Sequence, residues 1–115
     1  MPTGYFGAST GAAAALAAAA QDPAIRAIVS RGGRPDLAGD LLPTVTAPTL
    51  LLVGGEDHGV IELNESALER LTSIKSLVIV PGATHLFEEP GALDEVAHFA
   101  TGWFVKYLRA AVPSA

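Results

Sequence analysis

The sequence predicts an α/β fold with about four mainly parallel strands flanked by helices. Short apolar runs alternate with helical patterns along the chain, and the later runs are apolar at nearly every position, as in strands that are covered on both faces. The 115 residues are 50% hydrophobic and 17% charged, which is typical of one hydrophobic core. We therefore expect a single domain over residues 1–115.

Four apolar runs are predicted to be strands: residues 4–6, 24–30, 49–53 and 76–80. The last two consist almost entirely of leucine, valine and isoleucine. Because such a strand has no polar side to turn toward water, we expect these two runs to lie in the centre of the sheet.

Three helices are predicted between and after the strands, over residues 10–21, 63–73 and 91–111. The first is rich in alanine, which has the highest helix propensity, and Pro23 stops it. The second and third place apolar residues every three or four positions, which predicts amphipathic helices that cover the sheet. Residues 37–45, with Pro35 before them and Pro43 among them, form at most a short helix.

The pentapeptide Gly7-Ala8-Ser9-Thr10-Gly11 has the pattern G-x-S-x-G and stands between the first apolar run and the alanine-rich helix. A nucleophile elbow needs small residues at Gly7 and Gly11, because its turn is tight, and it exposes the hydroxyl of Ser9. The start of the following helix favours an oxyanion, with the N–H of Thr10 as the first expected donor. The simpler alternative is a plain turn and helix cap, which a chain rich in glycine and alanine also produces.

A serine nucleophile needs a base and a carboxylate that orients the base. Asp57 follows the third apolar run and His85 follows the fourth. Because the carboxyl ends of parallel strands meet at one edge of a sheet, we expect Ser9, Asp57 and His85 to converge there. Taken singly, such an aspartate is usually a turn residue and such a histidine a solvated one, but the order Ser, Asp, His favours the catalytic interpretation.

With these motifs the chain resembles the C-terminal half of an α/β-hydrolase, most of all the dienelactone-hydrolase-like branch. Residues 4–13 at the elbow, 51–57 at the acid loop and 81–91 at the base loop carry the resemblance. It implies an abbreviated α/β-hydrolase fold in which Ser9 is the nucleophile, His85 the general base and then acid, and Asp57 the residue that holds the histidine tautomer. It also implies ester hydrolysis with no cofactor and no metal.

The chain departs from this family in two respects. The nucleophile of the dienelactone hydrolases proper is a cysteine, and this chain contains none. A full α/β-hydrolase is much longer, so the resemblance covers only its later strands and lacks the loop that supplies a second oxyanion donor. The first strand would then be an unpaired edge, which predicts a homo-oligomer, most simply a two-fold dimer, that covers this edge or the flank of the alanine-rich helix.

The leading hypothesis is a carboxylesterase-like serine hydrolase that cleaves small esters through an acyl-enzyme at Ser9. The alternative is a truncated module, weakly active or inactive, that acts by oligomerising or by pairing with a missing N-terminal half. A third interpretation, an acyltransferase or lactonase, uses the same triad with another acceptor or substrate. The sequence leaves the natural substrate and the acceptor open.

Charge and composition argue against other classes. The 12 acidic residues outnumber the 7 basic ones, which disfavours nucleic-acid binding. The apolar stretch 11–20 is shorter than the roughly 20 residues of a membrane span, and no basic segment precedes it as in a signal peptide. A cytoplasmic location is therefore the default expectation. The absence of cysteine excludes disulfides and thiolate metal sites.

The sequence assigns no site to the other two histidines. His58 follows Glu56 and Asp57 directly, but adjacent residues on one loop seldom point at one ion, so we expect no metal site there. His98 lies beside apolar positions of the last predicted helix, which indicates a packed or half-exposed side chain.

Other charged and aromatic residues are interpreted structurally. Glu88 and Glu89 are expected to stabilise the N-terminus of the last helix, although either has the chemistry of an acid catalyst. Three arginines near Gly32-Gly33 are interpreted as solvated, with an anionic substrate as the alternative: Arg26, Arg31 and Arg34. Three aromatic residues are expected to pack the last helix or an interface: Trp103, Phe104 and Tyr107.

Overall fold

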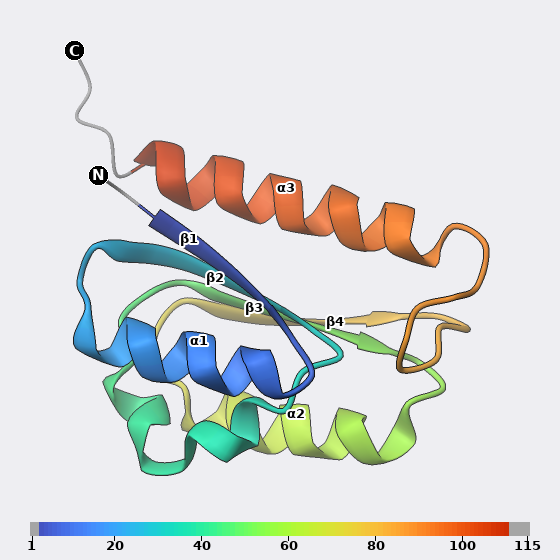
Figure 1. The fold of residues 1–115 in the computed structure, drawn as a ribbon, viewed down its shortest axis with the longest axis horizontal. Coiled ribbons are helices and arrows are strands. Elements are labelled where there is room, and N and C mark those ends of the chain that lie inside the picture. Colours follow the sequence, from blue (N-terminus) through green and yellow to red (C-terminus); the bar gives the residue numbers. More distant parts are fainter. Residues whose placement is uncertain (1–2, 111–115) are drawn as a thin grey trace.

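The computed structural model describes residues 3–110 (Figure 1). Its elements are, in order, β1 (Thr3–Ala8), α1 (Thr10–Gln21), β2 (Ile25–Arg31), the 3₁₀ helix η1 (Pro35–Thr44), β3 (Thr49–Gly54), α2 (His58–Arg70), β4 (Lys75–Val80) and α3 (Ala92–Ala110). Helices α1 and α2 cover one face of the sheet and α3 covers the other (Figure 1). The predicted α/β class, with strands between two layers of helices, is confirmed.

The four strands form one parallel sheet in the order β1-β2-β3-β4. All of β3 is buried, as predicted for a central strand. The same prediction is wrong for residues 76–80, because β4 is an outer strand of the described sheet. Leu77 and Val78 of β4 pack against the cores on opposite faces, so the apolar run reflects two covered faces and not two neighbouring strands.

Helix α2 begins at His58, earlier than the predicted start at residue 63. Asp57 occupies the N-cap position, and its carbonyl accepts a hydrogen bond from the N–H of Ile61 at 3.0 Å. The first turn contains Gly59 and Val60, and because both have low helix propensity the sequence does not predict a helix there. The consequence for the site is that Asp57 lies directly at a helix terminus and not in the middle of a loop.

The other helices lie close to their predicted bounds. Helix α1 matches residues 10–21, and the short helix expected near residues 37–45 is η1, which is kinked at Gly39. Helix α3 begins at Ala92, and residue 111 of the prediction lies outside the described residues. Within residues 3–110, no helix combines the length and the apolar character that a membrane span requires.

The sheet separates two hydrophobic cores. Neighbouring residues of β2 enter different cores, since Ile28 faces α1 and α2 whereas Val29 faces α3. The predicted packing of the aromatic residues of α3 is found: the indole N–H of Trp103 donates to the carbonyl of Pro48 at 3.1 Å, and Phe104 packs against the second core. These two layers hold the carboxyl ends of the strands, and the loops that leave them, in fixed positions.

Candidate functional site

Ser9 lies in the turn between β1 and α1. Its φ of 50° and ψ of −126° are a backbone conformation that residues other than glycine rarely adopt, at a cost of about 1–3 kcal/mol. A Cβ on Gly7 would lie 2.7 Å from the Cα of Ala12, so the turn has room only for glycine there. A Cβ on Gly11 would meet nothing within 4 Å, so space does not require the second glycine of the motif.

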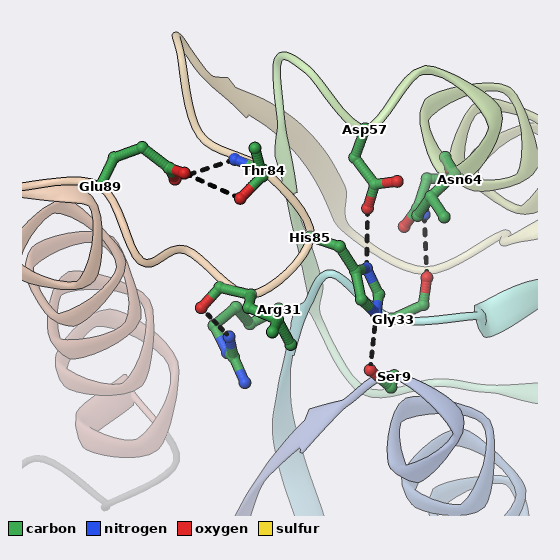
Figure 2. A network of polar contacts seen from close by, with 10 residues as sticks. Ser9, Arg31, Gly33, Asp57, Asn64, Thr84, His85 and Glu89 are labelled. Carbon is green, nitrogen blue, oxygen red and sulfur yellow. Dashed lines mark hydrogen bonds and ion pairs between the residues drawn. The ribbon is translucent and has the colours of Figure 1, made fainter.

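Ser9, His85 and Asp57 come together at one end of the sheet, as expected (Figure 2). The Nε2 atom of His85 lies 3.0 Å from Oγ of Ser9, and its Nδ1 atom lies 2.8 Å from Oδ2 of Asp57. A carboxylate only accepts hydrogen bonds, so the proton of neutral His85 belongs on Nδ1 and the lone pair of Nε2 faces the serine hydroxyl. This geometry allows His85 to take a proton from Ser9.

The side chains of His85 and Asp57 differ in exposure in a way that suits proton transfer. The side chain of Asp57 is 16% exposed, whereas that of His85 is 40% exposed. The carboxylate is thus largely shielded behind the imidazole, while the histidine remains accessible from outside. Thr10, the next residue after Ser9, is the first residue of α1, so its N–H belongs to the helix N–H groups that have no partner within the helix.

The carboxylate of Glu89 closes the loop that carries His85 by two hydrogen bonds to Thr84, which we call the carboxylate clamp. The Oε1 atom of Glu89 accepts the backbone N–H of Thr84 at 2.9 Å, and Oε2 accepts the hydroxyl of Thr84 at 2.8 Å (Figure 2). These two hydrogen bonds, the backbone one first, lower the pKa of Glu89. The backbone carbonyl of Glu89 accepts the N–H of Ala92 at the start of α3, but its carboxylate bonds to Thr84 and not, as the sequence had predicted, to the helix N-terminus.

The lowered pKa of Glu89 predicts a pH dependence of stability. A carboxyl group whose pKa is lower in the folded state stabilises the fold above its unfolded pKa, and this contribution is lost as the pH falls through the folded pKa. We expect Glu89→Gln to lower the free energy of unfolding more at about pH 7 than at about pH 3, measured by urea denaturation. Glu88→Gln is the control, because Glu88 makes no hydrogen bond or ion pair within residues 3–110. A pH-independent effect of Glu89→Gln would contradict the clamp.

Sequence reasoning did not find the segment that lies between Ser9 and His85. It follows β2 and consists of Gly32, Gly33 and Arg34. Gly32 has a φ of 55°, and a Cβ there would lie 3.1 Å from the carbonyl oxygen of His85. On the other side, the N–H of Arg34 donates to the carbonyl of Ser9 at 2.9 Å. The available signal was the double glycine directly after a predicted strand.

Gly33 is the most tightly enclosed residue of this segment. A Cβ there would overlap Oγ of Ser30 and Cβ of Ala12, both of which are buried. We expect Gly33→Ala to lower the free energy of unfolding by at least about 1–3 kcal/mol through overpacking, measured by urea denaturation. Gly102→Ala is the control, since Gly102 lies in α3 with open space at its Cβ position, and we expect a stabilisation of up to about 1 kcal/mol. Equal free energies of unfolding for the two variants would contradict the close packing around Gly33.

The residues next to Asp57 do not join the site chemically. Glu56 and His58 are exposed, and residues 3–110 contain no group of three potential metal-ligating side chains. His98, predicted to be packed or half-exposed, is instead exposed on α3, where its ring centroid lies 5.6 Å from that of Phe99.

The three arginines lie in different places. Arg34 forms a two-pronged ion pair with Asp36, at 3.0 and 2.9 Å, and this pairing lowers the pKa of Asp36. Arg31 lies over the ring of Phe87 at 5.4 Å, next to the His85 loop. Arg26, expected near the double glycine, instead lies toward the amino end of β2 and lines a cavity of about 450 Å³ with Pro23, Thr46 and Tyr107. This cavity is separate from the Ser9 site.

Comparison with known proteins relates this geometry to a family. A crystal structure of a dienelactone hydrolase from Anabaena variabilis matches 90% of this chain with a TM-score of 0.89 and 64% sequence identity. The chain thus resembles the α/β-hydrolases in both sequence and fold. The esterase domain of a Rhodothermus marinus protein has the same fold, with a TM-score of 0.82 and 24% identity; the match covers 92% of this chain and 61% of that domain's chain. No family model matches the chain.

The relatives are longer than this chain. It covers 49% of the dienelactone hydrolase, which is consistent with the expected C-terminal half. A Mycobacterium tuberculosis protein named "Putative phosphoribosyl transferase" is 60% identical in an alignment of 116 positions that covers 99% of this chain and 26% of that protein. The chain thus spans about half of one relative and about a quarter of the other. Together the comparisons confirm the resemblance to α/β-hydrolases and the predicted fold.

Proposed function

We propose that this chain is a serine hydrolase of the carboxylesterase type, which cleaves small esters through an acyl-enzyme on Ser9. The observation that carries the proposal is the unbroken hydrogen-bond chain from Ser9 through His85 to Asp57, built from the ends of three different strands. The similarity to a dienelactone hydrolase supports an ester-type bond, because a lactone is a cyclic ester. The name of the mycobacterial relative describes a protein of which this chain matches only 26%, so we propose no phosphoribosyl transfer.

The proposed reaction proceeds in two halves. Oγ of Ser9 bonds to the ester carbonyl carbon while Nε2 of His85 takes the hydroxyl proton, and Asp57 stabilises the resulting imidazolium. The carbonyl oxygen becomes an oxyanion, for which the N–H of Thr10 at the positive end of α1 is the proposed donor. The oxyanion then returns to a carbonyl as the bond from the carbon to the alkoxy oxygen breaks, and His85 gives its proton to that oxygen, so that the alcohol leaves and the acyl group stays on Ser9. Water attacks the acyl group in the second half, His85 again takes and returns a proton, and the carboxylic acid leaves Ser9 free.

A fluorophosphonate probe tests the proposal directly, because only an activated serine reacts with it at neutral pH. We expect intact-mass analysis to show one added probe group and peptide mapping to place it on Ser9. Ser66→Ala is the matched control: Ser66 is exposed on α2, so its removal should leave labelling unchanged. Absence of labelling on Ser9 in folded wild-type protein would overturn the proposal.

The outer position of β1 supports a second proposal, which concerns assembly. Within residues 3–110, β1 pairs only with β2, and its side chains Tyr5 and Phe6 are 37% and 50% exposed. An apolar strand edge of this kind is a site for pairing with another chain. We propose a two-fold homodimer that covers this edge, and we expect light scattering at micromolar concentration to give twice the chain mass. A monodisperse monomer would contradict it.

A further inference from the structure

Asn64 is a fully buried polar residue for which the proposed chemistry has no direct use. It lies in α2 with 0% exposure, and its Nδ2 atom donates to the carbonyl of Gly33 at 3.1 Å and to that of Val60 at 2.8 Å (Figure 2). Two carbonyl acceptors fix the amide orientation, because only the nitrogen of the amide is a donor. Its Oδ1 atom is buried and has no hydrogen-bond partner within residues 3–110, so burying this oxygen lowers the stability of the fold.

The bond to Gly33 connects Asn64 to the nucleophile. Gly33 is followed by Arg34, whose N–H donates to the carbonyl of Ser9 at 2.9 Å. The path from Asn64 to Ser9 therefore consists of one hydrogen bond, one peptide unit and a second hydrogen bond. Because Ser9 has a strained backbone conformation, it keeps this conformation only if its surroundings hold it there.

The same helix that carries Asn64 also begins at the acid of the site. Asp57 caps α2, and Asn64 lies two turns further along it. We infer that Asn64 is a positioning residue: through Gly33 and Arg34 it holds the Ser9 turn in register with the helix that presents Asp57, and so keeps Oγ of Ser9 in line with His85. This inference rests on the proposed function for its effect on rate, but the mechanical link is testable without any activity.

The most specific variant removes the hydrogen bond from residue 64 to Gly33 and keeps the one to Val60. A threonine hydroxyl in a helix reaches the carbonyl four residues earlier, so Asn64→Thr retains the bond to Val60 but does not extend to Gly33. Ala67→Gly is the matched control: Ala67 is buried in the same helix, in the core with Leu71, and glycine there costs about 1 kcal/mol of helix stability. The control therefore weakens α2 without touching residues 32–34.

Amide hydrogen exchange separates a local effect from a global one. The N–H of Arg34 bonds to Ser9, whereas that of Gly32 bonds to the carbonyl of Leu52 at 2.7 Å. We expect Asn64→Thr to accelerate exchange at Arg34 by about tenfold more than at Gly32, and Ala67→Gly to accelerate both amides equally. Equal acceleration in Asn64→Thr would overturn the link from Asn64 to the elbow, whether or not the protein hydrolyses esters.

The kinetic readout then connects the link to function. We expect Asn64→Thr to lower the rate of fluorophosphonate labelling at Ser9, and kcat for ester hydrolysis, by about 10- to 100-fold with KM nearly unchanged, because misplacement of the reacting atoms costs this much. Labelling as fast as in Ala67→Gly would refute a positioning role. If wild-type protein is not labelled, the proposed function fails, and the exchange experiment still decides whether Asn64 holds the turn.

Discussion

Replacing Ser9 with alanine is expected to abolish the hydrolysis of p-nitrophenyl acetate and p-nitrophenyl butyrate, with a loss in kcat of up to about a million-fold. These substrates need little pocket and have good leaving groups, so they are the first to test. Alanine removes Oγ, the atom 3.0 Å from Nε2 of His85, and leaves the base without a proton to take. The measurement is initial rate against enzyme concentration for both proteins.

Two controls separate the loss of the nucleophile from a loss of folding. Ser66→Ala should retain full activity, and thermal unfolding of Ser9→Ala should match wild type, because alanine leaves the backbone hydrogen bonds of the turn in place. Unchanged hydrolysis in Ser9→Ala would mean that the activity lies elsewhere. No hydrolysis by wild-type protein would favour the assembly module, in which the motifs of the family persist without turnover.

Asp57→Asn is expected to lower kcat by about 10⁴-fold without unfolding the protein. The amide nitrogen of asparagine is a donor, so it favours the imidazole tautomer with the proton on Nε2, which cannot accept the proton of Ser9. Asparagine is as good an N-cap as aspartate, so α2 should still begin at His58. The measurement is kcat and KM for p-nitrophenyl acetate, together with urea denaturation.

Glu56→Gln is the matched control for this prediction. It removes a neighbouring carboxylate that is exposed and makes no hydrogen bond or ion pair within residues 3–110. We expect its kcat to stay within about twofold of wild type. If Asp57→Asn also stays within that range, the contact between His85 and Asp57 has no role in the chemistry. If both variants lose activity equally, the effect is the net charge of the loop and not the orientation of the imidazole.

The Ser9 turn and the positions of Asp57 and His85 after strands could be predicted from the sequence, because each depends on a short stretch of residues. The pattern around Ser9 predicts a tight turn at a helix start, and apolar runs before Asp57 and His85 predict that both follow strands. Parallel strands then bring these ends to one edge, and the structure has the three side chains there. Their catalytic roles, the single domain, the cytoplasmic location and the dimer stay predictions.

The alternation of strands and helices follows from hydrophobic periodicity and from the positions of glycine and proline, which are local properties of the chain. The place of a strand at the edge of the sheet is not local, since apolar residues on both sides of a strand indicate covered faces and not hydrogen-bonded neighbours. The tertiary structure decided that place and also the roles of Gly33, Asn64 and Glu89. The contacts that define the first two roles, Ala12 against Gly33 and Gly33 against Asn64, join different parts of the chain, and no periodicity or short motif encodes such contacts.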